Sequence, residues 1–161
     1  GVSGAGRNAS LPLIFCEANE SVRAYSVPKH RHLSEIEQEL SKAAGQQVAI
    51  SFTPHLVPVH NGICSTTSAQ LTADPDQVQQ ALERAYADEF FVRLLGKGGC
   101  ADTKNVTGTN FIDIGWDYDS RTGRVLLLSA EDNLGKGAAG QAIQNFNLIC
   151  AFPETAGLQN F

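Results

Sequence analysis

The sequence predicts an α+β fold in which helices cover one face of a mixed, mostly antiparallel sheet. Apolar and polar residues alternate over 112–118, a turn-forming run follows at 119–123, and apolar residues return at 125–128. This pattern predicts an antiparallel hairpin. Residues 78–86 carry an apolar stripe at helical spacing, which predicts an amphipathic helix packed on a core. The elements follow the order strand, helix, strands, helix, strands, helix.

The first part of the chain contains a strand, a helix and a second strand by pattern. Residues 21–27 favour a short strand. Ser34 and Glu37 have the spacing of a capping box, so we expect a helix over 34–44 that ends at the following glycine. Alternation over 48–53 predicts a half-buried strand, which the two nearby prolines then break.

The middle of the chain adds two strands and the clearest helix. Residues 63–72 are rich in Thr and Ser and predict a strand, and residues 91–95 predict another. Between them, Asp74 has the character of an N-cap and Pro75 that of a first helical residue. We therefore expect the amphipathic helix to begin at this pair.

The last part of the chain has a capped helix rich in small residues. Asp132 or Asn133 can cap it, and its apolar face is formed by Ala139, Ala142, Ile143 and Phe146. Glycines at 137 and 140 lower helix propensity, which makes sense if another backbone packs closely there. The aspartates of the preceding hairpin are expected on the solvated face of their strand.

Composition limits the function classes. The chain has 161 residues, 42% of them hydrophobic and 18% charged, with a net charge of −5, which suits one globular domain and gives little support to nucleic-acid binding. No run of 18 apolar residues is present, so we expect no membrane span. The four cysteines are widely spaced, which argues against a metal site. No signal peptide precedes them, so we expect reduced thiols in a cytosol-like compartment.

Three stretches carry candidate chemistry. His30 and Arg31 stand just before the first helix, where imidazole could move protons and guanidinium could bind an anion, although a solvated surface loop is the alternative. His55, in a proline-flanked segment, is either a packed histidine or a site residue. The small-residue segment 1–7 could bring backbone N–H groups close to a ligand or could be a flexible terminus.

Taken together, these motifs closely resemble the N-acetyl-gamma-glutamyl-phosphate reductase family of arginine biosynthesis. The motifs that carry the resemblance are Ser3-Gly4-Ala5-Gly6-Arg7, His30-Arg31-His32 with Glu35-Ile36, Phe52-Thr53-Pro54-His55-Leu56, Gly62-Ile63, and Asp132-Asn133-Leu134 with Lys136-Gly137-Ala138-Ala139-Gly140-Gln141-Ala142. The first and last of these also resemble the wider group that includes aspartate-semialdehyde dehydrogenase.

The resemblance implies a fold like the C-terminal domain of glyceraldehyde-3-phosphate dehydrogenase-like enzymes. It covers only the C-terminal half of such a reductase, so the NADP-binding Rossmann domain and the nucleophilic cysteine would lie outside this chain. We carry the nucleophile onto none of the four cysteines. We expect residues 1–131 to form a catalytic and dimerisation domain, and residues 132–161 to pack against the missing Rossmann domain.

The implied reaction reduces an acyl phosphate to an aldehyde with NADPH through a cysteine thioester. By resemblance His30 is the general acid/base, Arg31 and His55 bind substrate, and the cofactor is contacted by Ser3, Gly4, Ala5, Gly6 and Asn133. Two departures from the family pattern stand out. Asn61 replaces a usual arginine, and Gly135 replaces a larger apolar residue.

The resemblance further implies a cytoplasmic homo-oligomer, a dimer or tetramer, that binds a small acyl phosphate. Two other functions remain open at this point. The chain could be a truncated, non-enzymatic dimerisation module, or it could belong to a semialdehyde dehydrogenase of the aspartate type.

Overall fold

The computed structural model describes residues 1–159, which form two compact units. The larger unit contains Gly1, residues 3–6 and residues from His60 onward. The smaller unit contains Val2 and residues 7–59. Each unit has its own sheet, so we describe each by itself.

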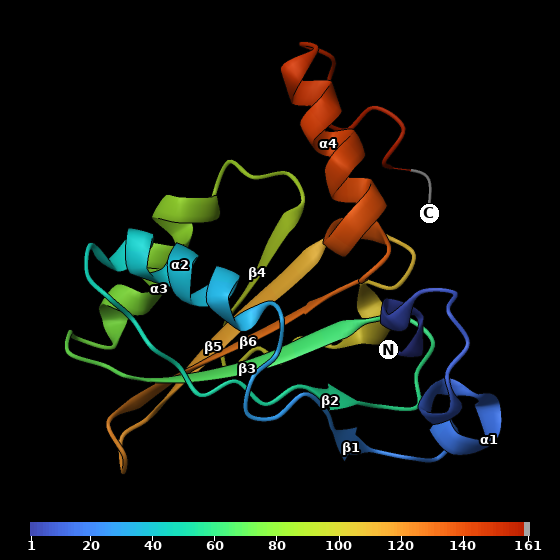
Figure 1. Cartoon of the computed structure of the whole chain (residues 1–161). Coiled ribbons are helices and arrows are strands. Elements are labelled where there is room, and N and C mark those ends of the chain that lie inside the picture. Colours follow the sequence, from blue (N-terminus) through green and yellow to red (C-terminus); the bar gives the residue numbers. More distant parts are fainter. Residues whose placement is uncertain (160–161) are drawn as a thin grey trace. The chain divides into compact units, whose positions relative to one another are not determined.

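A four-stranded sheet forms the centre of the larger unit (Figure 1). Its order is β3-β6-β5-β4, made of Ile63–Gln70, Arg124–Glu131, Ile112–Asp119 and Val92–Lys97. Strands β3 and β5 pair antiparallel with β6, whereas β4 pairs parallel with β5. The prediction of a mixed, mostly antiparallel sheet is confirmed, as is the hairpin formed by β5 and β6.

Helix α3, Asp76–Tyr86, connects β3 to β4 and packs beside β4. It begins at Asp76, whose N–H donates to the Asp74 carboxylate at 3.0 Å, one residue later than the proline expected at its start. The indole N–H of Trp116, on β5, donates to Gln79 of this helix at 2.7 Å. This bond satisfies the polar atom of a side chain that is otherwise buried in the core.

Close backbone packing sets the geometry of the β4–β5 pair. A Cβ added to Gly115, in the middle of β5, would overlap the carbonyl of Gly99. The ladder register also shifts between Leu94 and Gly96. The chain can therefore fold back against β5 only because no side chain stands at position 115.

The segment after β6 continues through a π-helical turn, η4 (Gly135–Ala139), into α4 (Gly140–Ile149), which extends away from the end of the sheet (Figure 1). A Cβ on Gly135 would overlap the Thr109 carbonyl, and one on Gly140 would overlap the Asn110 side chain. The close packing expected at this run of small residues is thus present. Much of the apolar surface of α4 is exposed, at Ile143, Phe146, Leu148 and Ile149.

The smaller unit is held by one short antiparallel ladder and one long helix. Strands β1 (Arg23–Ala24) and β2 (His55–Leu56) pair with each other. The first strand is therefore much shorter than the pattern over 21–27 indicated. Helix α2 spans Leu33–Ala44, and short helical turns η2 (Leu11–Leu13) and α1 (Phe15–Ala18) precede these elements.

The strand predicted over 48–53 is wrong, and so is the capping box at the start of α2. The Val48 N–H donates to the Ser41 hydroxyl at 2.9 Å, and the Ile50 N–H donates to the Glu37 carboxylate at 3.0 Å. Side chains of α2 thus accept the backbone N–H groups that would otherwise bond to a neighbouring strand. Glu37 serves this segment instead of the helix start, where His32 is the N-cap without a side-chain hydrogen bond. The expected stop at Gly45 is confirmed, with φ of 65°.

Among residues 1–159, no helix is both long and apolar enough to cross a membrane.

Candidate functional site

Two of the predicted cofactor-binding residues, Ser3 and Asn133, meet in the larger unit. The Asn133 amide donates to the Ser3 hydroxyl at 2.9 Å, and the carboxamide oxygen of Asn133 accepts the Gly62 N–H at 2.7 Å. Ser3 and Asn133 are 130 positions apart in the chain. The resemblance placed both residues beside one cofactor, and the fold brings them into direct contact.

Asn61 joins the same cluster. The Ser3 hydroxyl donates to the Asn61 carboxamide oxygen at 2.7 Å. The next residue, Gly62, is buried with φ of 125°, and a Cβ there would lie 2.8 Å from the Thr103 methyl group. Only glycine suits this turn, because both the backbone angle and the space exclude a side chain. The turn therefore fixes where Asn61 and the Gly62 N–H point.

Asp132 precedes Asn133 and binds backbone N–H groups beside the cluster. Its side chain is buried and accepts three backbone N–H groups: Gly108 at 2.7 Å, Leu134 at 2.7 Å and Gly135 at 3.2 Å. Burial alone would raise the pKa of this carboxyl, but the three N–H donors and the Asn61 side chain outweigh it and lower the pKa. Asp132 is thus ionised and accepts N–H groups where η4 begins, but the expected N-cap at 132 or 133 is wrong, because the N-cap of η4 is Leu134 and that of α4 is Ala139.

Two further ionisable groups lie next to Asp132. Burial raises the pKa of Glu131; Lys136 opposes this rise and Asp132 adds to it. Burial lowers the pKa of Lys136, whose ammonium donates to Gln144 at 2.8 Å and lies 5.8 Å from the centre of the Phe91 ring. Sequence reasoning did not single out Glu131 or Lys136 as charged neighbours of the cluster, because their proximity depends on how β6 runs into η4.

The smaller unit holds the predicted proton-transfer group. His30 is half-buried, and its ring lies edge-on to the rings of Tyr25, His32 and Phe52, with centroids 4.9–5.6 Å away. Its Nδ1 accepts the backbone N–H of His32 at 3.1 Å, so a neutral ring carries its proton on Nε2. Burial, followed by the charges of His32 and Arg31, lowers the pKa of His30.

The predicted substrate-binding residues are in the same unit. Arg31 is exposed. His55 is exposed on β2, opposite Ala24, and its Nδ1 lies 3.2 Å from the Thr53 carbonyl. A shallow hollow of about 310 Å³ is lined by Val27, Pro28, Ile50, Ser51, Phe52 and Thr53. It shares Phe52 with the ring contacts of His30, so a small ligand there would reach the neighbourhood of the imidazole.

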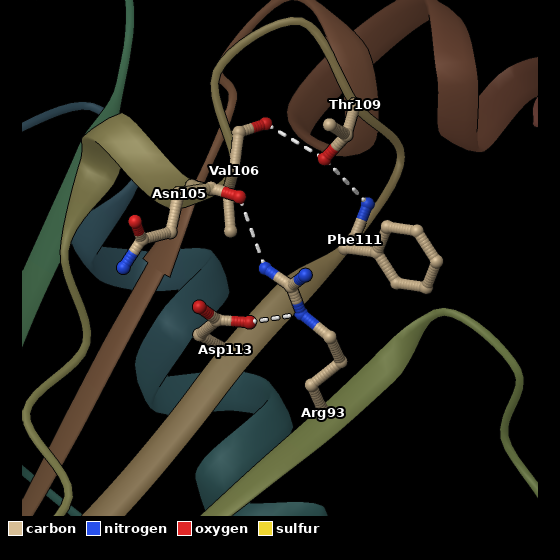
Figure 2. Close-up of polar contacts among 6 residues, drawn as sticks. All are labelled: Arg93, Asn105, Val106, Thr109, Phe111 and Asp113. Atoms are coloured by element: carbon tan, nitrogen blue, oxygen red, sulfur yellow. Dashed lines mark hydrogen bonds and ion pairs between the residues drawn. The ribbon is translucent and has the colours of Figure 1, made fainter. Parts of the chain in front are cut away.

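A partly buried ion pair contacts the loop 105–111 (Figure 2), and the Gly108 N–H of this loop donates to Asp132. Arg93 Nε contacts the Asp113 carboxylate at 2.6 Å, and its Nη2 donates to the Asn105 carbonyl at 3.0 Å. The guanidinium also lies 4.9 Å from the centre of the Phe111 ring. Asp113 was expected on the solvated face of its strand, and this prediction is wrong, because its side chain is only 3% exposed. The pattern shows alternation along β5 but not which neighbour covers each face.

We compared the chain with known proteins. Residues 1–133 match the family model described as semialdehyde dehydrogenase, dimerisation domain. A protein of Akkermansia muciniphila named N-acetyl-gamma-glutamyl-phosphate reductase is 67% identical over 98% of this chain and 46% of its own length. A protein of the same name from Acetivibrio thermocellus is 51% identical over 99% of this chain and 47% of its own length. The chain thus spans about half the length of these curated relatives.

Solved structures support the fold. Aspartate semialdehyde dehydrogenase II from Vibrio cholerae superposes with a TM-score of 0.66 at 18% identity, over 94% of this chain and 50% of that protein. A probable aspartate-semialdehyde dehydrogenase from Pseudomonas aeruginosa gives 0.60 at 19% identity, over 83% of this chain and 40% of that one. At such identities the likeness concerns the fold alone, and it agrees with the predicted α+β class. From the family match over residues 1–133, the chain belongs to the semialdehyde dehydrogenase dimerisation-domain family.

Proposed function

We propose that this chain is part of an NADP-dependent reductase that converts N-acetyl-glutamyl phosphate to N-acetyl-glutamate semialdehyde and phosphate. The relatives that match nearly the whole chain bear the name of that reductase. The structural observation that carries the proposal is the contact between Ser3 and Asn133, two residues that the resemblance assigns to one cofactor site.

The residues of this cluster fit a nicotinamide group. Asn133 uses one amide hydrogen for Ser3 and one oxygen lone pair for Gly62, which leaves one donor and one acceptor. A primary carboxamide, such as that of nicotinamide, pairs with such a set. Gly4, Ala5 and Gly6 are exposed beside it and offer backbone without bulky side chains. When bound, the nicotinamide cofactor would supply the hydride for the reduction.

In this proposal His30 moves the proton. Its lowered pKa keeps the ring neutral at neutral pH, so the ring can take the proton of a thiol. A thiolate from polypeptide outside this chain would displace phosphate from the acyl carbon and form the thioester. His30 would take the proton of that thiol, stabilise the thiolate as imidazolium, and later give the same proton to the carbonyl oxygen. Acid/base help of this type contributes about 10²–10⁴-fold in rate.

The remaining assignments complete the proposed enzyme. Arg31 offers a guanidinium to a substrate carboxylate or phosphate, and His55 offers a second polar contact. Residues 1–131 would be the catalytic and dimerisation part. The exposed apolar side chains of α4, within 132–161, would pack against the nucleotide-binding domain outside this chain. The enzyme would act in the cytoplasm as a dimer or tetramer.

The test is His30→Ala in the full-length reductase, with His60→Ala as a matched control at an exposed histidine. We expect kcat to fall about 10²–10⁴-fold in the first variant and to change little in the control, with circular dichroism unchanged in both. Because the pKa of His30 is lowered from 6.5, the limb of the pH–rate profile that it controls should lie below pH 6.5. Full activity of His30→Ala removes His30 from the mechanism.

Two alternatives are separated by further assays. A substrate panel that includes aspartyl phosphate distinguishes a semialdehyde dehydrogenase of the aspartate type. An assay of the 161-residue chain with and without the nucleotide-binding half distinguishes a non-enzymatic dimerisation module. We expect no activity from the chain alone and restored activity when the other half is added.

A further inference from the structure

We infer that Ser3, Asn61 and Asp132 are positioning residues that fix the orientation of the Asn133 carboxamide. The cluster is a one-way ring: hydrogen bonds run from the Gly62 N–H through Asn133 and Ser3 to Asn61, the Asn61 amide faces Asp132, and the backbone joins Asn61 to Gly62 and Asp132 to Asn133. The inference rests on the proposed function, because it concerns how Asn133 would present itself to the nicotinamide group.

The first fixed point is the backbone N–H of Gly62. A backbone N–H can only donate, so the atom of Asn133 that lies 2.7 Å from it must be the carboxamide oxygen. The amide nitrogen of Asn133 then faces the Ser3 hydroxyl at 2.9 Å and donates to it. The Ser3 oxygen accepts this bond, so its own hydrogen is free to donate to the Asn61 oxygen at 2.7 Å.

The second fixed point is the Asp132 carboxylate. With its oxygen bonded to Ser3, the Asn61 side chain turns its amide nitrogen toward Asp132, and this donor is among the groups that lower the pKa of Asp132. An ionised carboxylate can only accept. The series of side chains thus begins at the Gly62 N–H, which cannot accept, and ends at the Asp132 carboxylate, which cannot donate.

The ring is closed by the chain itself. Asn61 precedes Gly62, and Asp132 precedes Asn133. Rotating the Asn133 amide by 180° would set its NH₂ against the Gly62 N–H, and rotating the Asn61 amide would set its oxygen against the Asp132 carboxylate. Either change faces like groups and leaves polar atoms unpaired.

This direction has a functional consequence. One amide hydrogen and one oxygen lone pair of Asn133 remain, and they occupy fixed sides of the carboxamide. The Ser3 hydroxyl both accepts and donates inside the ring, so it has no proton to transfer and no role as a nucleophile. Ser3 and Asn61 would act on the cofactor only through Asn133.

The first experiment tests the direction of the ring in the 161-residue chain by thermal unfolding at pH 8.5. Asn61→Asp replaces an amide by an isosteric carboxylate that still accepts from Ser3 but now faces Asp132. The other charged groups near the ring are Glu131 and Lys136.

We expect Asn61→Asp to lower Tm more than Asn61→Ala does, although Ala removes more atoms. A Tm for Asn61→Asp equal to or above that of Asn61→Ala would show that no donor of Asn61 faces Asp132, which overturns the inference.

The second experiment tests positioning in the full-length reductase. NADPH contains nicotinamide, whereas 2′,5′-ADP carries only the adenine nucleotide part. We expect Ser3→Ala to weaken NADPH binding about tenfold, the size of one lost hydrogen bond, and to leave the Kd for 2′,5′-ADP unchanged. Ser41→Ala is the matched control, because that hydroxyl also makes two hydrogen bonds, to the Glu37 carbonyl and from the Val48 N–H. It should leave the ratio of the two Kd values unchanged.

The outcomes separate the two claims. If the wild-type protein binds NADPH no more tightly than 2′,5′-ADP, the proposed cofactor role of Asn133 is overturned, and the inference with it. If the wild-type protein binds NADPH more tightly than 2′,5′-ADP, and Ser3→Ala leaves the ratio of these two Kd values unchanged, only the inference is overturned.

Discussion

Replacing Arg93 by alanine should destabilise the larger unit more than replacing Arg121 does. Arg93 Nε contacts Asp113 at 2.6 Å; the arginine side chain is 42% exposed and the aspartate only 3%. After the change, a carboxylate on the central strand β5 would remain buried without its cation. The carbonyl of Asn105 would lose a donor, and the Phe111 ring would lose the guanidinium above it.

The magnitude follows from these contacts. Removing one partner of a buried ion pair costs about 3–5 kcal/mol. The partial exposure of Arg93 allows water to enter after the change, which places the loss of the pair at or below the lower end of that range. Including the Asn105 bond and the aromatic contact, we expect a total loss of about 3 kcal/mol. For a chain of this size that corresponds to a fall in Tm of roughly 6–12 °C.

The assay is urea unfolding followed by tryptophan fluorescence. The chain has one tryptophan, Trp116, and it is buried on β5, so its emission reports the unfolding of the larger unit. Arg121→Ala is the matched control. Arg121 pairs with Asp119 at 3.3 Å but is 86% exposed, so its loss should cost less than about 1 kcal/mol.

A double-mutant cycle isolates the pair itself. Because Asp113→Asn removes the buried charge, the double variant should be less destabilised than the sum of the two single variants, by about 1.5 kcal/mol or more. If Arg93→Ala costs no more than Arg121→Ala, the side chain of Asp113 is solvated in solution, and the reasoning about its burial is refuted.

Two further predictions concern backbone packing and acid stability. Gly115→Ala should cost about 3 kcal/mol or more, or prevent folding, because its Cβ would overlap the Gly99 carbonyl. Gly98→Ala, with φ of 77° and open space, should cost only about 1–2 kcal/mol in the same urea assay, and equal losses would contradict the overlap. Asp132→Ala should destabilise the chain by about 3 kcal/mol at pH 7, since three backbone N–H groups lose their acceptor. Because the folded pKa of Asp132 lies below 3.8, its contribution is present above pH 3.8 and is lost as the pH falls through the folded value. The Tm difference between wild type and variant should therefore shrink in acid, and a constant difference down to pH 2 would contradict the lowered pKa.

Local patterns predicted the elements whose stability comes from their own periodicity. The stripe of α3, the alternation of β5 and the apolar run of β6 each extend over enough residues to identify the element. The same alternation over 48–53 was misleading, because strand formation requires a partner for the backbone N–H groups. Ser41 and Glu37 of α2 had already supplied acceptors for two of them.

The candidate site was only partly readable from the chain. Motif resemblance selected Ser3, His30 and Asn133, and the fold brought Ser3 and Asn133 into contact. It gave no hint that Asn61, noted only as a departure from the family pattern, would accept a hydrogen bond from Ser3. A substitution in a motif shows that something differs, whereas the partner of the new side chain depends on which turn lies opposite.

The α+β class, the hairpin, the amphipathic helix and the family could all be predicted from the chain, because each of these depends on residues that are near one another or on a recognisable order of motifs. The burial of Asp113 against Arg93 and the series of hydrogen bonds that joins Asn61, Ser3, Asn133 and Gly62 became visible only in the folded chain. The physical reason is that hydrogen bonds and ion pairs act over about 3 Å between atoms that can be more than a hundred residues apart. No local repeat in the chain records which of those atoms will meet.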